Sequence, residues 1–309
     1  DVCSSDLIAR LAERGWLANI GSELEFVLFR ESYDSAREKG YRNLKPANAY
    51  NVDYSVLGTT MVEDVIRPIR LAMKAAGLKV EDSKGECNLG QHEINFRYRD
   101  ALGMADDHVF YKLAAKEIAY LHGAAITFMA KVNQLEGNSC HIHCSFWEGD
   151  ESLFPGDGAG GHSELYDRYI AGQVARTHEL SFLFAPNVNS YKRYAYGSFA
   201  PTTLLWGRDN RTCAFRSVGH GRGLRLETRI AGGDANPYLA FSAIIAAGLD
   251  GDGPNHAKIG VKFAIGLVIL VLVMANMRKP SIPQGLYYGI LALTVANIAI
   301  AVFWAPAHS

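Results

Sequence analysis

The chain has 309 residues, 49% of them hydrophobic and 20% charged, a composition typical of a globular protein with one large domain or two ordinary ones. Lysine and arginine number 31 against 32 aspartates and glutamates, so the chain lacks the basic excess that nucleic-acid phosphates require. Five cysteines, an odd number, without a recognisable secretory signal predict reduced thiols and a cytoplasmic catalytic region.

Residues 1–16 are expected to form a leader outside the main domain. The opening DVCSSDL resembles the translation of a sequencing adapter, so an assembly artefact is one interpretation and an ordinary frayed terminus is the other. A helical stretch, IARLAERG, follows it. We therefore read the fold from residue 17 onward.

Residues 17–252 predict one α+β domain. Long helices beside strands with polar residues on one face favour a single sheet with helices on its outer face. Glycine and aspartate recur at 150–162 and 194–210, which predicts loops there. Strand patterns occupy 18–29, 78–86, 91–98, 126–132, 140–147, 212–218 and 225–230. Helical patterns occupy 62–76, 101–122, 163–180 and 236–248.

Acidic residues alternate with apolar ones in the first strand. In GSELEF, Glu23 and Glu25 stand two residues apart, so both carboxylates point to one face while Leu24 and Phe26 point to the other. An edge strand with a solvent-exposed face would show the same pattern. The sequence around the other carboxylates must distinguish the two interpretations.

Two later segments add further carboxylates. GECNLGQHEINF carries Glu86 and Glu93 on either side of a glycine turn, and RLETR carries Glu227 and Arg229 two residues apart. If these faces converge with the first strand, the carboxylates crowd into one cavity, where their charges require cations.

The segment GNSCHIHCSFW, at 137–147, places His141 and His143 on one strand face and Cys140 and Cys144 on the other. A hydrogen-bonded pair of half-buried histidines is one interpretation, and a metal or nucleotide site is the other. Because the thiols point away from the imidazoles, a zinc site is disfavoured. Carboxylate oxygens with a single imidazole favour Mg²⁺ or Mn²⁺.

Seven arginines occur between residues 193 and 229. Any one of them is ordinarily a solvated side chain, but beside a carboxylate cluster they predict an anion site, because guanidinium groups bind phosphate and carboxylate through paired hydrogen bonds. The sequence has neither a P-loop nor a dinucleotide fingerprint, so we expect ATP-dependent chemistry with the nucleotide lying on a sheet. The seven are Arg193, Arg208, Arg211, Arg216, Arg222, Arg225 and Arg229.

The composition changes after residue 252. Two apolar runs, 263–277 and 285–306, flank RKPSIPQ, and the second has the ~20 apolar residues that cross a bilayer. Residues 253–309 are therefore expected to form a two-helix transmembrane hairpin, with a buried helical pair as the alternative. Lysines and arginines are balanced around the runs, which leaves the orientation open.

Taken together, the motifs resemble the catalytic domain of the glutamine synthetase family over residues 17–251. They are, in chain order, GSELEF, the two glutamates around GQHE, FMAK followed by GNSCHIH, NSYKR, RDNRTCAFR, and LETR followed by GGDANPYLAF. The resemblance implies a curved antiparallel sheet or half-barrel with outer helices, two or three Mg²⁺ or Mn²⁺ ions, and ATP as co-substrate. It implies a ligase that makes γ-glutamyl phosphate from glutamate and ATP and then transfers the glutamyl group to an amine.

The resemblance also implies roles for individual residues. The metal ligands would be Glu25, Glu86 and Glu93 beside the glutamate, and Glu23, His141 and Glu227 beside the ATP phosphates. The nucleotide contacts would come from His143, Ser145, Arg216, Arg222 and Arg225. The catalytic arginines on the glutamate and the transferring phosphate would be Arg193, Arg211 and Arg229, and Gly137 would contact glutamate through its backbone.

Three departures from the family pattern are visible. Ammonia-using members carry a glutamate where this chain has Phe199 in GSFAPT, and a phenyl ring can wall a pocket for an organic amine. The chain therefore resembles the γ-glutamylpolyamine or γ-glutamyl-monoamine synthetase branch. The small amino-terminal domain of the family's homo-oligomeric rings is expected to be absent. The pattern also stops near Asp252, which predicts a truncated chain fused to an unrelated membrane-like tail, in which activity and ring assembly can be lost.

The expected partners are glutamate, ATP and an amine, with the tail contacting a membrane. Three alternatives remain open: an ammonia-using glutamine synthetase, a non-catalytic nucleotide-binding or regulatory relative, and a phosphagen-type guanidino kinase. The six candidate metal ligands argue against a binding module, and the GNSCHIH and NPYLAF segments argue against the kinase.

Overall fold

A computed structural model of the chain describes residues 2–250, 265, 268–269, 271–273, 275–276 and 283–303. The chain divides into two compact units, 1–251 and 252–309. The first unit contains the sheet and all the residues to which the sequence assigns a role. The second contains helix α10 (Gln284–Phe303).

Within the described residues, ten strands form one sheet in the order β2-β3-β1-β6-β10-β9-β8, with β4 and β5 paired to β1 and β7 paired to β6. The long β1 is central to it, because it pairs along its length with four other strands. The strands are β1 (Trp16–Phe29), β2 (Val80–Gly85), β3 (Gln91–Phe96), β4 (Arg99–Asp100), β5 (Ala125–Thr127), β6 (Cys140–Glu148), β7 (Glu151–Ser152), β8 (Trp206–Arg208), β9 (Phe215–Val218) and β10 (Arg225–Thr228).

The sheet is mixed, which corrects the prediction of a purely antiparallel one. β8 runs parallel to β9, with Trp206 opposite Phe215, whereas the other pairs are antiparallel. The chain leaves β8 at Asp209, whose φ of 47° is in the left-handed region and whose backbone N–H donates to the carbonyl of Ser217. β8 also lies inside 194–210, where a loop was predicted. Three residues are too few to show a strand pattern in the sequence.

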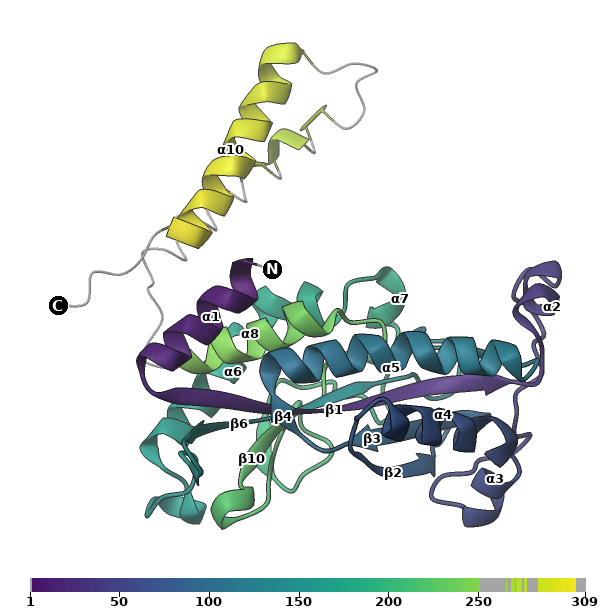
Figure 1. Ribbon diagram of the computed structural model, residues 1–309. Helices are drawn as coiled ribbons and strands as arrows, with labels where there is room; N and C mark the ends of the chain where they lie inside the picture. The colour runs from purple at the N-terminus through teal and green to yellow at the C-terminus, as the bar shows by residue number, and fades with distance from the viewer. Residues whose placement is uncertain are drawn as a thin grey trace. The chain divides into compact units, whose positions relative to one another are not determined.

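Helices α1 (Val2–Glu13), α5 (Ala101–Leu121), α6 (Glu164–Phe184) and α8 (Pro237–Leu249) lie together on one side of the sheet (Figure 1). They cover the apolar face of the strands, on which Ile20, Leu24 and Ile142 are fully buried. α1 belongs to this layer, since Leu11 is buried in the same core. The other α-helices of the first unit are α2 (Tyr33–Glu38), α3 (Val56–Thr60), α4 (Glu63–Ala75) and α7 (Val188–Tyr191).

Local sequence explains where the long helices begin. α5 starts after Asp100, whose side chain accepts a hydrogen bond from the backbone of Gly103, and α6 starts after Ser163 in the same way. α8 has Asn236 as its N-cap and Pro237 at its first turn, where a missing N–H does no harm. The observed boundaries of these helices lie within a few residues of those predicted from the helical patterns.

Among the residues that the structure describes, no helix has both the length and the apolar character needed to cross a bilayer. The transmembrane hairpin predicted at 253–309 therefore lacks support. Seven of the 15 residues of its first apolar run, 263–277, and residues 278–282 of the loop after it lie outside the described residues.

Candidate active site

The polar face of the sheet, opposite the helices, carries the acidic residues of three strands. The strand register explains how they meet. Glu25 on β1 lies directly opposite Glu93 on β3, and Glu23 on β1 lies directly opposite His141 on β6. Glu227 on β10 is the partner of His143 on the same β6. The convergence that the sequence pattern predicted is therefore present.

Glu25, Glu86 and Glu93 form the first cluster. One oxygen of each lies within 4.8 Å of the other two, and Glu25 and Glu93 are only 7% and 1% exposed. Glu25 Oε2 accepts hydrogen bonds from Gln91 Nε2 at 3.0 Å and from the backbone of Ser139 at 2.7 Å. These contacts fix the carboxylate with one edge toward its acidic neighbours.

The charges in this cluster repel one another. Burial, and then the negative charges of Glu86 and Glu93, raise the pKa of Glu25 to about 8. The pKa of Glu86 and that of Glu93 are raised as well, first by burial and then by a neighbouring carboxylate. An oxygen-only set of crowded carboxylates fits a hard divalent cation such as Mg²⁺ or Mn²⁺.

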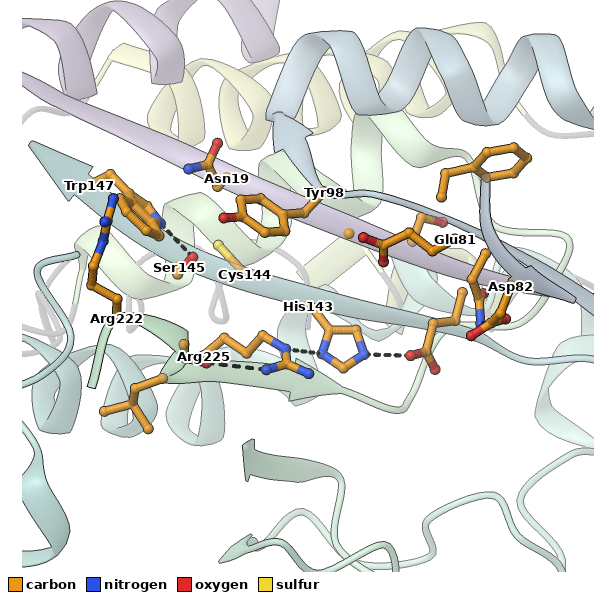
Figure 2. Close-up of a pocket in the computed structure, with 17 residues that line it drawn as sticks. Asn19, Glu81, Asp82, Tyr98, His143, Cys144, Ser145, Trp147, Arg222 and Arg225 are labelled. Atoms are coloured by element: carbon orange, nitrogen blue, oxygen red, sulfur yellow. Dashed lines mark hydrogen bonds and ion pairs between the residues drawn. The ribbon is translucent and has the colours of Figure 1, made fainter. Parts of the chain in front are cut away.

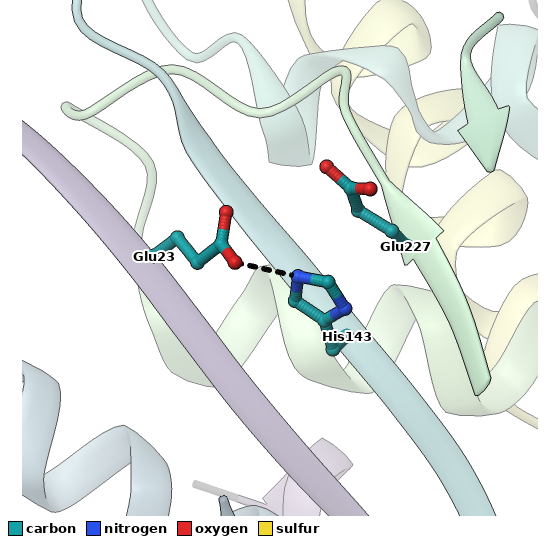
Figure 3. Close-up of side chains that lie close together, drawn as sticks. All are labelled: Glu23, His143 and Glu227. Carbon is teal, nitrogen blue, oxygen red and sulfur yellow. Dashed lines mark hydrogen bonds and ion pairs between the residues drawn. The ribbon is translucent and has the colours of Figure 1, made fainter. Parts of the chain in front are cut away.

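Glu23, His143 and Glu227 form the second cluster (Figure 3), again with one ligand atom of each within 4.8 Å of the others. Both imidazoles contact Glu23: His143 Nε2 lies 2.9 Å from Oε1, and His141 Nδ1 lies 3.3 Å from Oε2. His141 Nδ1 is also 3.6 Å from Glu227 Oε1. Burial alone would raise the pKa of Glu23, but its hydrogen bonds to the two histidines hold it well below its usual value.

Arginines complete the environment of Glu227. Arg216 Nη1 donates to Glu227 Oε2 at 2.8 Å, and Arg229 Nη1 donates to Oε1. Burial alone would raise the pKa of Glu227, but the histidines and Arg229 lower it to about 2. Glu227 is therefore ionised, and its carboxylate can act as a metal ligand or as a hydrogen-bond acceptor.

The tautomer of His143 follows from its two partners. Arg225 Nε donates to His143 Nδ1 at 3.1 Å, so the ring proton must sit on Nε2, which donates to Glu23. In this arrangement His143 has no lone pair for a metal. The imidazole nitrogen that remains between two carboxylates is Nδ1 of His141, the histidine to which the family resemblance assigns the metal role.

A cavity of about 340 Å³ opens beside the second cluster (Figure 2). Four of the residues assigned to the nucleotide line it: His143, Ser145, Arg222 and Arg225. Arg216, the fifth, does not line it. Its guanidinium is held by Glu227 and by Asp209.

Two aromatic rings form one wall of the cavity, and the sequence analysis missed both. Tyr98 and Trp147 stack with ring centroids 6.4 Å apart and planes 23° apart, and the Arg222 guanidinium lies 5.4 Å from the Trp147 ring. Trp147 Nε1 donates to Ser145 Oγ at 2.8 Å. Trp147 follows Ser145 by two residues on one strand, so the alternation that linked the histidines could have placed it on the same face.

Arg193 and Arg229 are buried, at 2% and 4% exposure. Arg193 Nη1 donates to the carbonyl of Ile230 at 2.8 Å. Within the described part of the chain, however, the Nε–H of each arginine has no hydrogen-bond partner. An unpaired buried N–H is unfavourable, so both groups fit an anion that binds next to them.

The backbone of Gly137 packs closely against Arg193, which leaves no room for a side chain at position 137. A Cβ atom at position 137 would be 2.4 Å from the carbonyl oxygen of Ala130 and 2.6 Å from Arg193 Cγ. Arg211 is exposed, and a hydrogen bond with the Tyr54 hydroxyl raises its pKa. The structure thus brings Gly137 and Arg193 together, whereas Arg211 is exposed and does not line the cavity.

Phe199 is 65% exposed and does not line the cavity. Its backbone N–H donates to Glu136 Oε2 at 3.1 Å, a contact that no local sequence pattern indicated. Burial, and then the charges of Asp53, Glu86 and Glu136, raise the pKa of Cys87 to about 12. Asp53 and Glu86 each place one carboxylate oxygen within 4.8 Å of the Cys87 thiol.

Comparison with known proteins identifies the site's relatives. Residues 4–268 match the family model described as "Glutamine synthetase, catalytic domain". The chain is 56% identical over 244 residues to gamma-glutamylethanolamide synthetase GlnA4 of Streptomyces coelicolor. The match covers 79% of this chain and 53% of that relative. It is 37% identical over 248 residues to glutamate–isopropylamine ligase of a Pseudomonas species, with 79% and 54% covered.

A solved structure described as "GmaS/ADP complex-Conformation 1" is similar to the chain with a TM-score of 0.70 and 35% sequence identity. The match covers 81% of this chain and 58% of that one. The chain thus spans about half the length of the curated relatives it matches.

Proposed function

The chain belongs to the glutamine synthetase family through its catalytic domain, and we propose that it is the catalytic part of an ATP-dependent glutamate–amine ligase that forms a γ-glutamyl amide. The observation that carries the proposal is the arrangement of two carboxylate clusters side by side on one sheet face. A cavity large enough for a ligand lies beside one of them, and buried arginines with free N–H groups lie close by.

The cavity fits a nucleotide. The stacked rings of Tyr98 and Trp147 offer a flat surface for a purine base, since stacking on aromatic side chains is a sequence-tolerant way to bind one. Arg222 and Arg225 stand at the same cavity, where guanidinium groups can neutralise phosphates. The similarity to a structure described as an ADP complex supports this assignment.

Divalent cations fit the two carboxylate clusters, with Glu25, Glu86 and Glu93 holding one and Glu23, His141 and Glu227 holding another. When bound, such cations supply positive charge that neutralises the oxygens of a transferring phosphoryl group. The chain's own part is to hold these carboxylates in place. It does so through Ser139 and Gln91 at Glu25, and through arginines 216 and 229 at Glu227.

Arg193 and Arg229 fit the glutamate and the phosphoryl group. In the first step an oxygen of the glutamate γ-carboxylate attacks the γ-phosphorus of ATP, and ADP leaves. Both the substrate carboxylate and the transferring group are anionic, and the free Nε–H groups of the two arginines can donate to them without displacing an existing bond. Gly137 keeps the backbone close enough to Arg193 to hold it in place.

In the second step the amine nitrogen attacks the acyl phosphate, phosphate leaves, and the nitrogen loses one proton. Phe199 cannot accept that proton. An amine that arrives as an ammonium ion must also lose a proton before the attack, because its nitrogen has no lone pair until then. Asp53 and Glu136, whose charges act on Cys87, can bind that ammonium group and take this earlier proton from it. Because Glu136 also holds the backbone of Phe199, we place the organic part of the amine beside this loop. The names of the ethanolamide synthetase and the isopropylamine ligase support an organic amine.

ADP release tests the proposal. The purified chain, supplied with ATP, glutamate and Mg²⁺ or Mn²⁺, is expected to release ADP in the presence of ethanolamine, isopropylamine or putrescine, and much less with ammonium chloride. Equal or faster release with ammonium would contradict the amine assignment. Absence of glutamate-dependent release in every mixture would contradict the ligase itself.

A further inference from the structure

Lys84 occupies a position within the first carboxylate cluster that the proposed reaction does not use. It lies on β2 directly opposite Glu93 on β3. Its Nζ is 2.7 Å from Glu86 Oε1 and 2.7 Å from Glu93 Oε1, and its side chain is 23% exposed. A protein ammonium group thus sits on two of the three carboxylates that would hold a divalent cation.

The ring of Tyr54 covers the same ammonium group. Lys84 Nζ lies 5.4 Å from the centre of the ring, within the range of a cation–π contact. Tyr54 has a left-handed backbone, with φ of 55°, and its N–H donates to the carbonyl of Gly85 at 3.2 Å. A Cβ at position 85 would lie 2.4 Å from the carbonyl oxygen of Val52. The glycine next to Lys84 therefore allows the loop that places the ring.

Lys84 is in this way held by two carboxylates and one aromatic face. A divalent cation that took one oxygen each from Glu25, Glu86 and Glu93 would come very close to the Lys84 ammonium group. Like charges at such a distance in a partly buried site repel strongly. The ammonium group and the divalent cation cannot both keep these positions.

We propose that Lys84 is a tethered cation that occupies the first metal position, and that a divalent cation binds there by displacing the Lys84 ammonium group. The inference rests on the metal site of the proposed function. Lys84 acts as a positioning residue, because it keeps Glu86 and Glu93 together before the metal arrives. It also lowers the affinity of the cluster for the metal, so that cations that bind weakly do not displace the ammonium group.

Direct binding of Mn²⁺, without ATP, glutamate or an amine, tests the inference. The comparison is between the unchanged chain, Lys84→Met, Lys84→Arg and the matched control Lys79→Met, an exposed lysine just before the same strand. Lys84→Met is expected to bind Mn²⁺ at least about tenfold more tightly, because it removes the competing charge. Lys84→Arg keeps the charge and is expected to bind no more tightly than the unchanged chain, and Lys79→Met should match the unchanged chain.

Equal or weaker binding by a folded Lys84→Met variant would overturn the displacement, even if the chain proved to be an active ligase. Absence of Mn²⁺ binding in every variant would overturn both the inference and the metal site on which it rests. Tyr54→Leu provides a second route should Lys84→Met fail to fold. It loosens the ammonium group without removing it, so Mn²⁺ should bind more tightly than to the unchanged chain, and unchanged binding would again count against displacement.

Discussion

Glu25 on β1 and Glu93 on β3 stand directly opposite each other in the sheet, and both side chains are buried. Like charges in this relationship destabilise a pair of strands. The pair persists because Lys84 and several hydrogen-bond donors surround it, and because the raised pKa of Glu25 favours its neutral form. The consequences of this crowding can be measured without assuming any reaction.

Glu25→Gln should change how stability depends on pH in the metal-free chain. Folding raises the pKa of Glu25 from 4.5 to about 8, so the stability that its protonated form contributes is fully present below 4.5 and is lost as the pH rises through about 8. The loss can reach about 1.4 kcal/mol per pH unit in that window. Glutamine stays neutral, so the variant should lose less stability than the unchanged chain as the pH rises.

Thermal unfolding in the presence of a chelator, between about pH 5 and about pH 9, measures this difference. Some pH dependence should remain, because the pKa of Glu86 and that of Glu93 are shifted the same way. Glu117→Gln, at an exposed helix position, serves as the control and should follow the unchanged chain. If the melting temperature of Glu25→Gln fell as steeply with rising pH as that of the unchanged chain, Glu25 would not carry the charge that we assign to it.

Gly137→Ala should destabilise the chain and displace Arg193. The new methyl group would overlap the carbonyl of Ala130 and the side chain of Arg193. Such overpacking typically lowers stability by about 1–3 kcal/mol, or ~2–10 °C in melting temperature. Gly285→Ala, where a Cβ meets nothing within 4 Å, is the control for the loss of a glycine. An unchanged melting temperature for Gly137→Ala would show that the backbone near Arg193 is looser than described.

Trp147→Leu should weaken nucleotide binding. Stacking on an aromatic side chain is worth about 1–3 kcal/mol per base, so ADP should bind roughly tenfold to hundredfold more weakly. Tyr98→Leu should act in the same direction, since Tyr98 forms the same wall. Calorimetric titration with ADP measures the change, and Tyr120→Leu, an exposed tyrosine on α5, is the control. ADP affinity that survives both replacements would place the base elsewhere.

Phe199→Glu should shift the preference from organic amines toward ammonia. A carboxylate at this position can bind ammonium, which a phenyl ring cannot, and it adds charge beside Glu136. The ratio of kcat/KM for ammonium to that for ethanolamine is expected to rise about tenfold or more. Tyr196→Glu, in the same loop and fully exposed, controls for added charge. An unchanged ratio would mean that Phe199 does not border the amine.

Much of the fold could be predicted because burial on one sheet face leaves a period of two in the sequence. Glu23 and Glu25, like His141 and His143, share a face for this reason, and the structure places them as expected. The long helices were predicted from their helical patterns, and the capping residues Asp100 and Ser163 lie at two of the observed starts. These signals are local, so a single sequence reveals them.

What was missed depends on the register between distant strands, which no local pattern encodes. Lys84 meets Glu93 only because β2 pairs with β3, and Glu136 meets Phe199 across a separation of 63 residues. The parallel β8 was too short to recognise. The roles of the residues as ligands and as substrate contacts remain predictions that the variants above address.

Transfer of labelled oxygen tests the central claim most directly. Glutamate labelled with ¹⁸O in its γ-carboxylate is supplied with ATP, Mg²⁺ and ethanolamine, and the phosphate released is analysed by mass spectrometry. Because the carboxylate oxygen attacks the γ-phosphorus and leaves with it when the amine attacks the acyl carbon, the account predicts one labelled oxygen in each phosphate and a γ-glutamyl amide that retains the other. Phosphate without label, released while ATP is consumed, would show that water rather than glutamate attacks ATP and would contradict a glutamate–amine ligase.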